Sequence, residues 1–236
     1  MGWRKTLLAF TLIAAAAIPR PARAQAGFGE VRQVLDGTAY TLEEGDLTVG
    51  ILGPIRYGLL DQLMIVTHPV LHLLLTPNAL LKWKAYDGDA ALAFNLGYIQ
   101  TFLDSKSFPG TVSFFPTVSF PINWRVVISA EAGYLLDLSP ITHGVMFGSS
   151  FSVLITDSDL LSLHVQDEYY WDGGGLTTPT IILAYSHAFY RMRLKVGLAV
   201  GRFPIQVGTT TRTNGDIVPD NRELPVYPVI DLWWQL

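Results

Sequence analysis

Residues 160–171 read LLSLHVQDEYYW, and this stretch decides the fold class. Polar residues occupy one set of alternate positions, namely Ser162, His164, Gln166 and Glu168. Apolar residues occupy the other set, namely Leu161, Leu163, Val165, Tyr169 and Trp171. Asp167 interrupts the apolar set. A two-residue period is typical of a β-strand that has one polar and one apolar face.

The same period recurs along most of the chain. It predicts twelve strands, over Thr38–Leu42, Asp46–Gly58, Gln62–Leu75, Ala79–Tyr86, Asp89–Phe102, Thr111–Phe120, Trp124–Leu136, Ile141–Thr156, Leu160–Trp171, Thr178–Ala188, Arg191–Phe203 and Val226–Leu236. Residues 43–45 (EEG) cut the first strand short, and His68-Pro69 is expected to bend the third. The count falls to ten if the first strand and one other do not form.

Tight and long connections alternate between these strands. The tight ones fall at Leu60-Asp61, Asp87-Gly88, Pro121–Asn123, Asp157–Asp159 and Phe189-Tyr190. Residues 103–110, 137–140, 172–177 and 204–225 form the longer connections. All tight turns then lie at one end of an antiparallel sheet and all loops at the other. This arrangement predicts an all-β fold, a closed up-and-down transmembrane barrel with its tight turns in the periplasm.

Aromatic residues gather near the predicted strand ends. Tyr57, Tyr86, Trp124, Phe189, Tyr190, Trp233 and Trp234 lie toward the tight turns. Tyr98, Phe102, Tyr134, Tyr170, Trp171 and Phe203 lie toward the loops. Amphipathic rings favour the level of lipid headgroups, so the positions predict two aromatic belts.

The amino-terminal 24 residues have the pattern of a secretory signal peptide. Arg4 and Lys5 precede an apolar run from Thr6 to Ile18, and residues 22–24 (ARA) form a cleavage site. Removing Met1–Ala24 takes four of 16 basic residues and none of 20 acidic ones, which leaves 12 against 20 and a net charge of −8. That balance gives no support to a nucleic-acid partner. Residues 25–37 are expected to be flexible, and 38–236 to form a single barrel domain.

The chain has no cysteine, which excludes a lipoprotein anchor, disulfides and thiolate metal sites. After residue 24, no stretch of 18 residues is free of charge and proline, so spanning helices are not expected.

The last predicted strand resembles the carboxy-terminal signal of bacterial outer-membrane proteins. Ile230, Leu232, Trp234 and Leu236 alternate with Val229, Asp231, Trp233 and Gln235, although the final residue of that signal is usually aromatic. Residues 40–45 (YTLEEG) and 52–59 (LGPIRYGL) are similar to segments of uncharacterised Gram-negative outer-membrane β-barrel proteins. The resemblance implies an outer-membrane location, contact with the lipid bilayer and recognition of the last strand by the assembly machinery. It implies no activity.

Ten charged or titratable residues are predicted to face the lumen: Arg56, Lys82, Lys84, Arg125, Glu131, His164, Glu168, Arg193, Lys195 and Asp231. They suit a constriction that selects small solutes or ions, because rings of fixed charge discriminate at close range. Alternatively, the charges pair with one another and plug the barrel. Eight strands leave room only for side chains and sixteen give a channel, so twelve strands leave both possibilities open.

Other chemistry has weaker support in the sequence. His68 and His72 have helical ligand spacing, but no third ligand is near, so an apolar loop or bent strand without metal is expected. Ser186-His187 are adjacent and would point to opposite faces, whereas Ser186 and His164 on neighbouring strands are the remaining pair for an acyl hydrolase. The acidic and amide residues of 204–225 fit no EF-hand and predict a solvated loop; residues 172–175 (DGGG) predict a flexible loop tip.

The sequence therefore predicts a narrow passive channel or solute-binding pore without cofactor or catalytic residue. The alternatives are a plugged structural barrel, an outer-membrane acyl hydrolase, and a soluble barrel that binds an apolar ligand. The last would turn its leucines inward and its polar faces outward.

Overall fold

The computed structural model describes residues 28–73, 76–100, 110–138, 141–171, 175–176, 179–211 and 217–235, with the side chains of 70, 73, 175, 176 and 202–224 excepted. The predicted signal peptide, Met1–Ala24, lies outside the described residues, and so do residues 103–109, 139–140, 172–174, 177 and 212–216 of the predicted loops.

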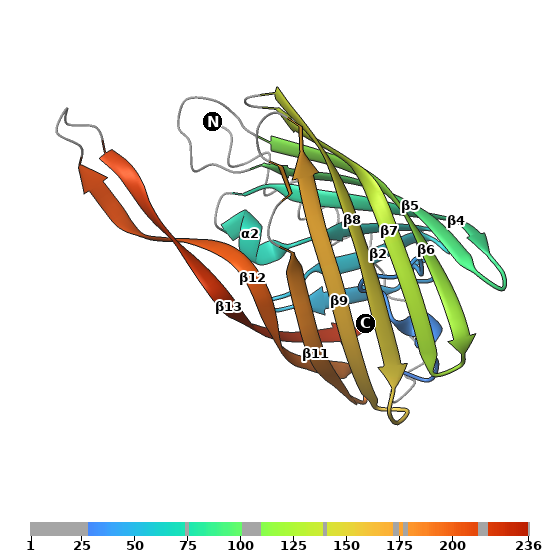
Figure 1. Cartoon of the computed structure of the whole chain (residues 1–236). Helices are drawn as coiled ribbons and strands as arrows, with labels where there is room; N and C mark the ends of the chain where they lie inside the picture. Colours follow the sequence, from blue (N-terminus) through green and yellow to red (C-terminus); the bar gives the residue numbers. More distant parts are fainter. Residues whose placement is uncertain are drawn as a thin grey trace, which may run out of the picture.

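The described residues form one closed antiparallel barrel of twelve strands, which confirms the predicted fold class (Figure 1). The strands are β1 (Leu47–Gly50), β2 (Ile55–Leu60), β3 (Leu63–Thr67), β4 (Asn78–Asp87), β5 (Ala91–Gln100), β6 (Gly110–Asn123), β7 (Val126–Leu138), β8 (Ile141–Leu154), β9 (Asp159–Tyr170), β11 (Thr180–Phe189), β12 (Met192–Thr211) and β13 (Ile217–Gln235). Each pairs with the next, and β13 pairs with β1 to close the ring. The two-residue β10 (Gly175–Leu176) adds to the edge of β9.

Short connections gather at one end of the barrel, called the turn end below. They join β2 to β3, β4 to β5, β6 to β7, β8 to β9 and β11 to β12. The opposite end is the loop end. This sorting agrees with the sequence prediction in part. The β6–β7 turn consists of Trp124 and Arg125, and Pro121 lies within β6. The longer connection predicted over 137–140 is wrong, because β7 continues to Leu138 and pairs there with Ile141, which leaves only residues 139–140 between β7 and β8 at the loop end.

The first part of the barrel differs from the prediction. Thr38–Leu42 forms no strand, whereas Asp46–Gly58 supplies two, β1 and β2, which are joined by residues 51–54. The predicted total of twelve is therefore reached with different strands. Gln62–Leu75 contains β3 followed by the short helix α2 (Pro69–Leu73). Pro69 opens this helix, because proline has no N–H and is tolerated in the first turn.

The prediction of a loop over 204–225 is wrong for its described backbone. β12 and β13 continue to pair as far as Thr211 opposite Ile217. Beyond Val200, where β11 ends its pairing with β12, the two strands leave the barrel wall as a projecting arm (Figure 1). Asp216 lies outside the described residues, as do the side chains of Asp220, Asn221 and Glu223.

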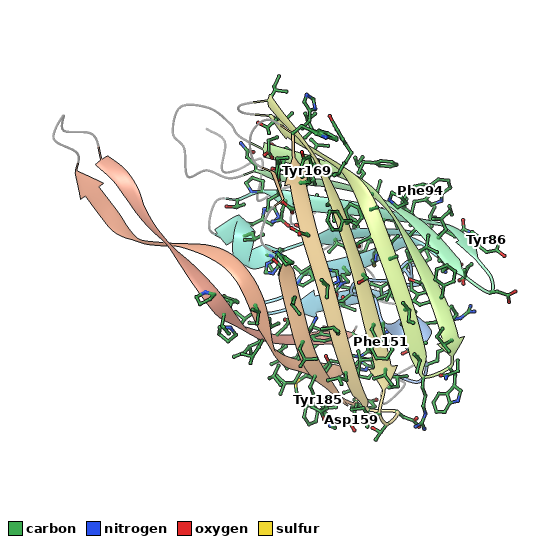
Figure 2. The ribbon with its side chains drawn as sticks, in the orientation of Figure 1. Tyr86, Phe94, Phe151, Asp159, Tyr169 and Tyr185 are labelled. Carbon is green, nitrogen blue, oxygen red and sulfur yellow. The ribbon has the colours of Figure 1, made fainter. Side chains whose placement is uncertain are left out.

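The outer surface of the barrel is apolar. Leu163, Leu183 and Leu198 lie side by side on β9, β11 and β12 and are 37%, 51% and 56% exposed. Figure 2 shows apolar and aromatic side chains covering this face. The orientation is the reverse of that predicted for a soluble barrel with inward leucines.

The predicted exposure of aromatic residues near the two ends of the barrel is confirmed in part. Tyr86, Trp124, Phe189 and Tyr190 are exposed near the turn end, and Tyr98, Tyr134 and Trp171 near the loop end. The prediction that Trp233 belongs to a belt is wrong, because this side chain is 7% exposed and lines the lumen. Tyr170 also faces inward and donates to the lumen residue Glu168. Phe102 and the side chain of Phe203 lie outside the described part. Among the described residues, no helix is long and apolar enough to cross a membrane.

Residues 28–46, called the plug below, fold into the lumen. The plug contains a 3-10 turn, η1 (Val31–Gln33). Its apolar side chains are buried, namely Phe28, Val31, Val34, Ala39, Tyr40 and Leu42. Most of them pack against inward-facing side chains of the wall, such as Val127, Leu154 and Leu160. The prediction of a flexible segment over 25–37 is therefore wrong for residues 28–37, because burying this apolar surface fixes the segment.

Candidate functional site: the plug and the lumen

The plug enters the barrel at the turn end, where three tight turns hold it. The backbone N–H of Phe28 donates to Asp157 O at 2.6 Å, and that of Val31 donates to Trp124 O at 3.0 Å. Arg32 forms an ion pair with Asp87 at 3.1 Å and donates to Gly88 O at 3.0 Å. These contacts involve the β8–β9, β6–β7 and β4–β5 connections, so the plug crosses the turn end of the lumen.

Residues 35–38, the tip of the plug, reach the lumen wall deeper in the barrel. Lys82 Nζ donates to Leu35 O at 3.2 Å and to Thr38 O at 2.8 Å. Gly37 has φ +65°, and a Cβ there would lie 3.0 Å from Ser150 Cβ and 3.2 Å from His164 Nδ1. Both the left-handed backbone and the close approach of the wall therefore require glycine at this position.

The chain then returns to the turn end. Ala39 N donates to Ser119 Oγ at 2.7 Å, and Thr41 Oγ1 donates to Asp61 O at 2.9 Å. Gly58 of β2 lies against the Glu43 carbonyl, which would collide with any Cβ at that position. The plug is thus a hairpin-shaped insertion whose two ends both lie at the turn end.

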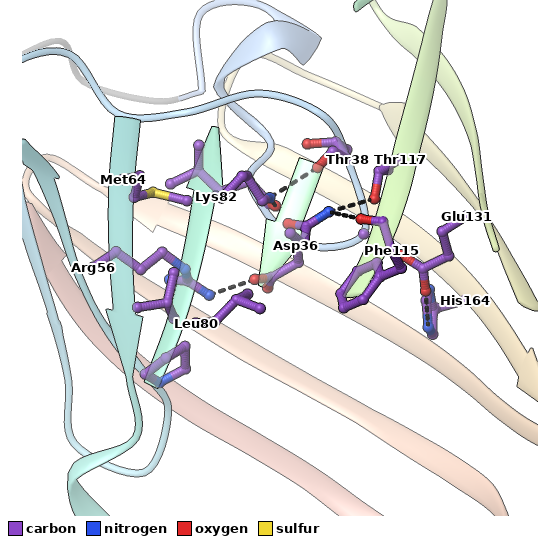
Figure 3. A pocket seen from close by; sticks show the side chains of 15 residues that line it. Asp36, Thr38, Arg56, Met64, Leu80, Lys82, Phe115, Thr117, Glu131 and His164 are labelled. Atoms are coloured by element: carbon purple, nitrogen blue, oxygen red, sulfur yellow. Dashed lines mark hydrogen bonds and ion pairs between the residues drawn. The ribbon is translucent and has the colours of Figure 1, made fainter. Parts of the chain in front are cut away.

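One ion-pair cluster fastens the tip to two separate strands. The Asp36 carboxylate binds the Arg56 guanidinium of β2 through one oxygen and Lys195 Nζ of β12 through the other, the latter at 2.9 Å (Figure 3 shows the pair with Arg56). The Arg56 and Lys195 side chains are 7% and 18% exposed, whereas Asp36 is 46% exposed. The two cations are therefore part of the wall, and the carboxylate faces open space inside the lumen.

Asp36 is expected to remain ionised in acid. Burial raises the pKa of its carboxyl, but Arg56 and Lys195 lower it by more, so the pKa lies well below the ordinary value of 3.8. A lowered pKa stabilises the folded plug above pH 3.8, and this stabilisation is lost as the pH falls toward the pKa of the folded protein. Carbon-13 NMR of the Asp36 carboxyl should show no titration between pH 7 and pH 4. A midpoint near 3.8 would contradict the ion pairs, and Asp36→Asn identifies the resonance.

Nine of the ten predicted lumen residues do face the lumen. Arg193 donates to Gln235 Oε1 at 3.2 Å and lies over the Phe28 ring at 4.6 Å. Lys84 pairs with Asp87 at 2.8 Å, and Glu131 lies 3.8 Å from His164. Three of the others, Arg56, Lys82 and Lys195, hold the tip of the plug. Glu168 accepts a hydrogen bond from Tyr170, and Asp231 on β13 lies opposite Lys195.

Arg125 is the exception. It lies in the two-residue β6–β7 turn and is exposed, with its guanidinium 4.1 Å above the Trp124 ring and a bond of 3.3 Å to Ile155 O. The sequence pattern predicted the turn at Pro121–Asn123, and Arg125 was therefore assigned to the strand Trp124–Leu136. Its observed position is the rim of the turn end.

Two cavities adjoin the tip. The smaller has about 200 Å³ and is bordered by Arg56, Lys82, Asn95, Thr117 and Glu131 (Figure 3). The larger has about 1100 Å³ and runs beside the plug. Its polar lining includes the neutral residues Thr48, Ser150, Ser152, Ser162, Ser186 and Gln235. It also has charges of both signs, namely Glu30, Asp36, Glu43, Glu44, Asp46, Asp61 and Asp87 together with Arg32, Arg56, Lys84, Arg191, Arg193 and Lys195. Asp36, Arg56 and His164 border both cavities, so the plug narrows the lumen without filling it.

The residues that the sequence suggested for a metal site and for a hydrolase have other contacts in the structure. His72 Nε2 lies 2.6 Å from Thr67 Oγ1, and His68 N donates to Asn78 Oδ1 at 2.7 Å, which ties α2 to β4. No group of three or more His, Asp or Glu among the described residues could hold a metal ion. Ser186 lies opposite Leu160 on β9, four residues along the strand from His164, so the two are not placed as a nucleophile and base.

Comparison with protein-family models, with curated proteins and with solved structures gives no match for this chain.

Proposed function

We propose that this protein is a narrow passive pore of the bacterial outer membrane, in which the plug sets the size of the solutes that pass. The observation that carries the proposal is the cavity of about 1100 Å³ beside the plug, lined by hydroxyl groups and by charged side chains of both signs. In a barrel with a purely structural role, the inward-facing side chains would pack against one another and leave no cavity of this size. Here Lys84, Ser162 and Lys195 border a cavity on one side of the plug.

A membrane location is supported by strand length and surface. β4 to β9 and β11 to β13 have ten or more residues each, and a spanning strand needs about 9–11. The exposed leucine row on β9, β11 and β12 suits lipid contact. The signal-peptide pattern and the alternation in β13 support export and recognition by the assembly machinery.

The lumen charges are of both signs. Arg56, Lys82 and Lys195 contact the tip, with Asp36, Asp231 and Glu131 as nearby acids, and six further acidic residues border the larger cavity. Fixed charges at a constriction attract counter-ions and repel co-ions.

Swelling of proteoliposomes in graded neutral sugars tests the pore. We expect swelling with small sugars and none with larger oligosaccharides. Absence of swelling with every solute would support the second candidate, a structural barrel with a closed lumen. That candidate has its own observation, since three turns hold the plug at the turn end.

Ion selectivity should follow the charge at residue 195. Lys195→Glu is expected to lower the anion-to-cation permeability ratio roughly threefold or more, because it reverses a charge on the cavity wall. Reversal potentials across planar bilayers under a salt gradient give the ratio. Lys195→Gln should produce a smaller shift, and an unchanged ratio in both variants would place Lys195 away from the ion path.

A further inference from the structure

The contact between Asp36 and the wall has the form of a bound ligand. One carboxylate is shared by two cations that come from different strands, with one oxygen bound to each. The cations are held by the barrel, whereas the carboxylate is carried on a loop whose ends are fixed elsewhere, at the turn end. The wall therefore constitutes a carboxylate site, and a residue of the same chain occupies it.

The Asp36 carboxylate is enclosed by the barrel, but it borders cavities inside the lumen and is therefore accessible to small solutes there. Asp36 is 46% exposed and borders both cavities, and Arg56 and Lys195 both border the larger one, so a small solute in the larger cavity can reach both cations. Carboxylates bind such cations through charge-assisted hydrogen bonds of the kind that Asp36 makes.

Withdrawal of the tip would leave the cations of the wall without their partners on the plug. Lys82 donates to the carbonyl groups of Leu35 and Thr38, so it would lose these partners together with the loss of Asp36 from Arg56 and Lys195. Arg56, Lys82 and Lys195 would then repel one another, with Asp231 and Glu131 as the remaining acids nearby. An added anion relieves this repulsion only when the tip is withdrawn, and such a difference in affinity shifts the equilibrium toward that state.

We propose that Asp36 is a tethered substitute for a carboxylate solute, which binds Arg56 and Lys195 in its place and releases the tip of the plug. The inference deepens the proposed function, on which it rests, by assigning small carboxylates as solutes and the plug as their gate.

A cysteine at position 39 reports on the tip. The chain has no cysteine, and the Ala39 side chain is fully buried where the plug meets the wall. In folded, detergent-solubilised Ala39→Cys, N-ethylmaleimide should react slowly, and succinate should speed the reaction. Sodium chloride of equal ionic strength and the neutral diamide succinamide serve as matched controls, because salt alone screens ion pairs.

Charge variants in the Ala39→Cys background complete the test. Asp36→Asn should raise the rate about tenfold or more without succinate, since it removes two charge-assisted contacts, and succinate should add little. Asp137→Asn changes a carboxylate on β7 that bonds Thr111, and it should leave both the basal rate and the succinate effect unchanged.

Three results would overturn the inference: no succinate effect where Asp36→Asn speeds labelling, an equal effect of sodium chloride, or slow labelling in Asp36→Asn. Labelling needs no transport. A succinate effect without liposome swelling would therefore leave the carboxylate site standing and reject the pore, whereas swelling without a succinate effect would do the reverse.

Discussion

A variant that lacks residues 28–42 is expected to conduct roughly threefold more current than the intact chain and to pass larger sugars, because a twelve-stranded barrel without its insertion has a wider open cross-section. The deletion removes Phe28, Val31, Val34 and Asp36 together, and with them both the apolar packing at the turn end and the ion pairs of the tip. Single-channel recording and swelling in graded sugars measure the two effects.

Folding of the deletion variant has to be shown independently. Heat-modifiable gel mobility provides that control, since a closed barrel migrates faster before heating than after it. Asp36→Asn keeps the whole plug and should have a smaller conductance effect than the deletion. If the folded deletion variant has the conductance of the intact chain, the plug does not limit the pore.

Leu183→Arg is expected to lower the free energy of unfolding in lipid vesicles by about 2–4 kcal/mol, the cost of an arginine on the lipid face near the bilayer midplane. Leu183 lies in the middle of β11, is 51% exposed and has Leu163 and Leu198 as its neighbours on the adjacent strands. Denaturant titration followed by tryptophan fluorescence measures the change.

Leu183→Val is the matched control, because it keeps an apolar side chain at the same position and should cost far less than the arginine. A surface that faced water would tolerate Leu183→Arg within about 0.5 kcal/mol, as exposed substitutions usually do. That outcome would reject the membrane location and with it the proposed pore.

Sequence alone located the long strands well. Ile141–Thr156 was predicted and Ile141–Leu154 is observed; Leu160–Trp171 was predicted and Asp159–Tyr170 is observed. These strands separate two environments, so their alternation is strict and easily seen. Asp46–Gly58 was misread because its alternation continues through the turn at 51–54, although Gly53-Pro54 is a turn signal.

The insertion of residues 28–46 into the lumen could not be predicted from the two-residue alternation, because this segment has no regular alternation. A signal was nevertheless present: Phe28, Val31, Val34 and Leu35 form an apolar group that a solvent-exposed leader would not need. The wall cations were identified from the alternation, since a strand face determines which side chains point inward. Their partner Asp36 was not, because the pairing depends on the path of an irregular segment across the lumen.

The short seam of the ring has a kinetic consequence. β13 meets β1 through three residue pairs, from Thr48 opposite Gln235 to Gly50 opposite Trp233, whereas β7 and β8 pair along the 13 residues of β7. Joining the first strand to the last carries the largest loop-closure entropy of any pairing in the barrel, and few hydrogen bonds repay it. We therefore expect this seam to form last during folding and to open first.

The plug leads directly into β1, so its fate is tied to that last step. A segment that lies inside when β13 reaches β1 is enclosed, whereas one that lies outside must thread through a finished ring. Insertion of the plug is thus part of barrel folding, and the order in which the strands pair determines whether the plug lies inside the closed barrel.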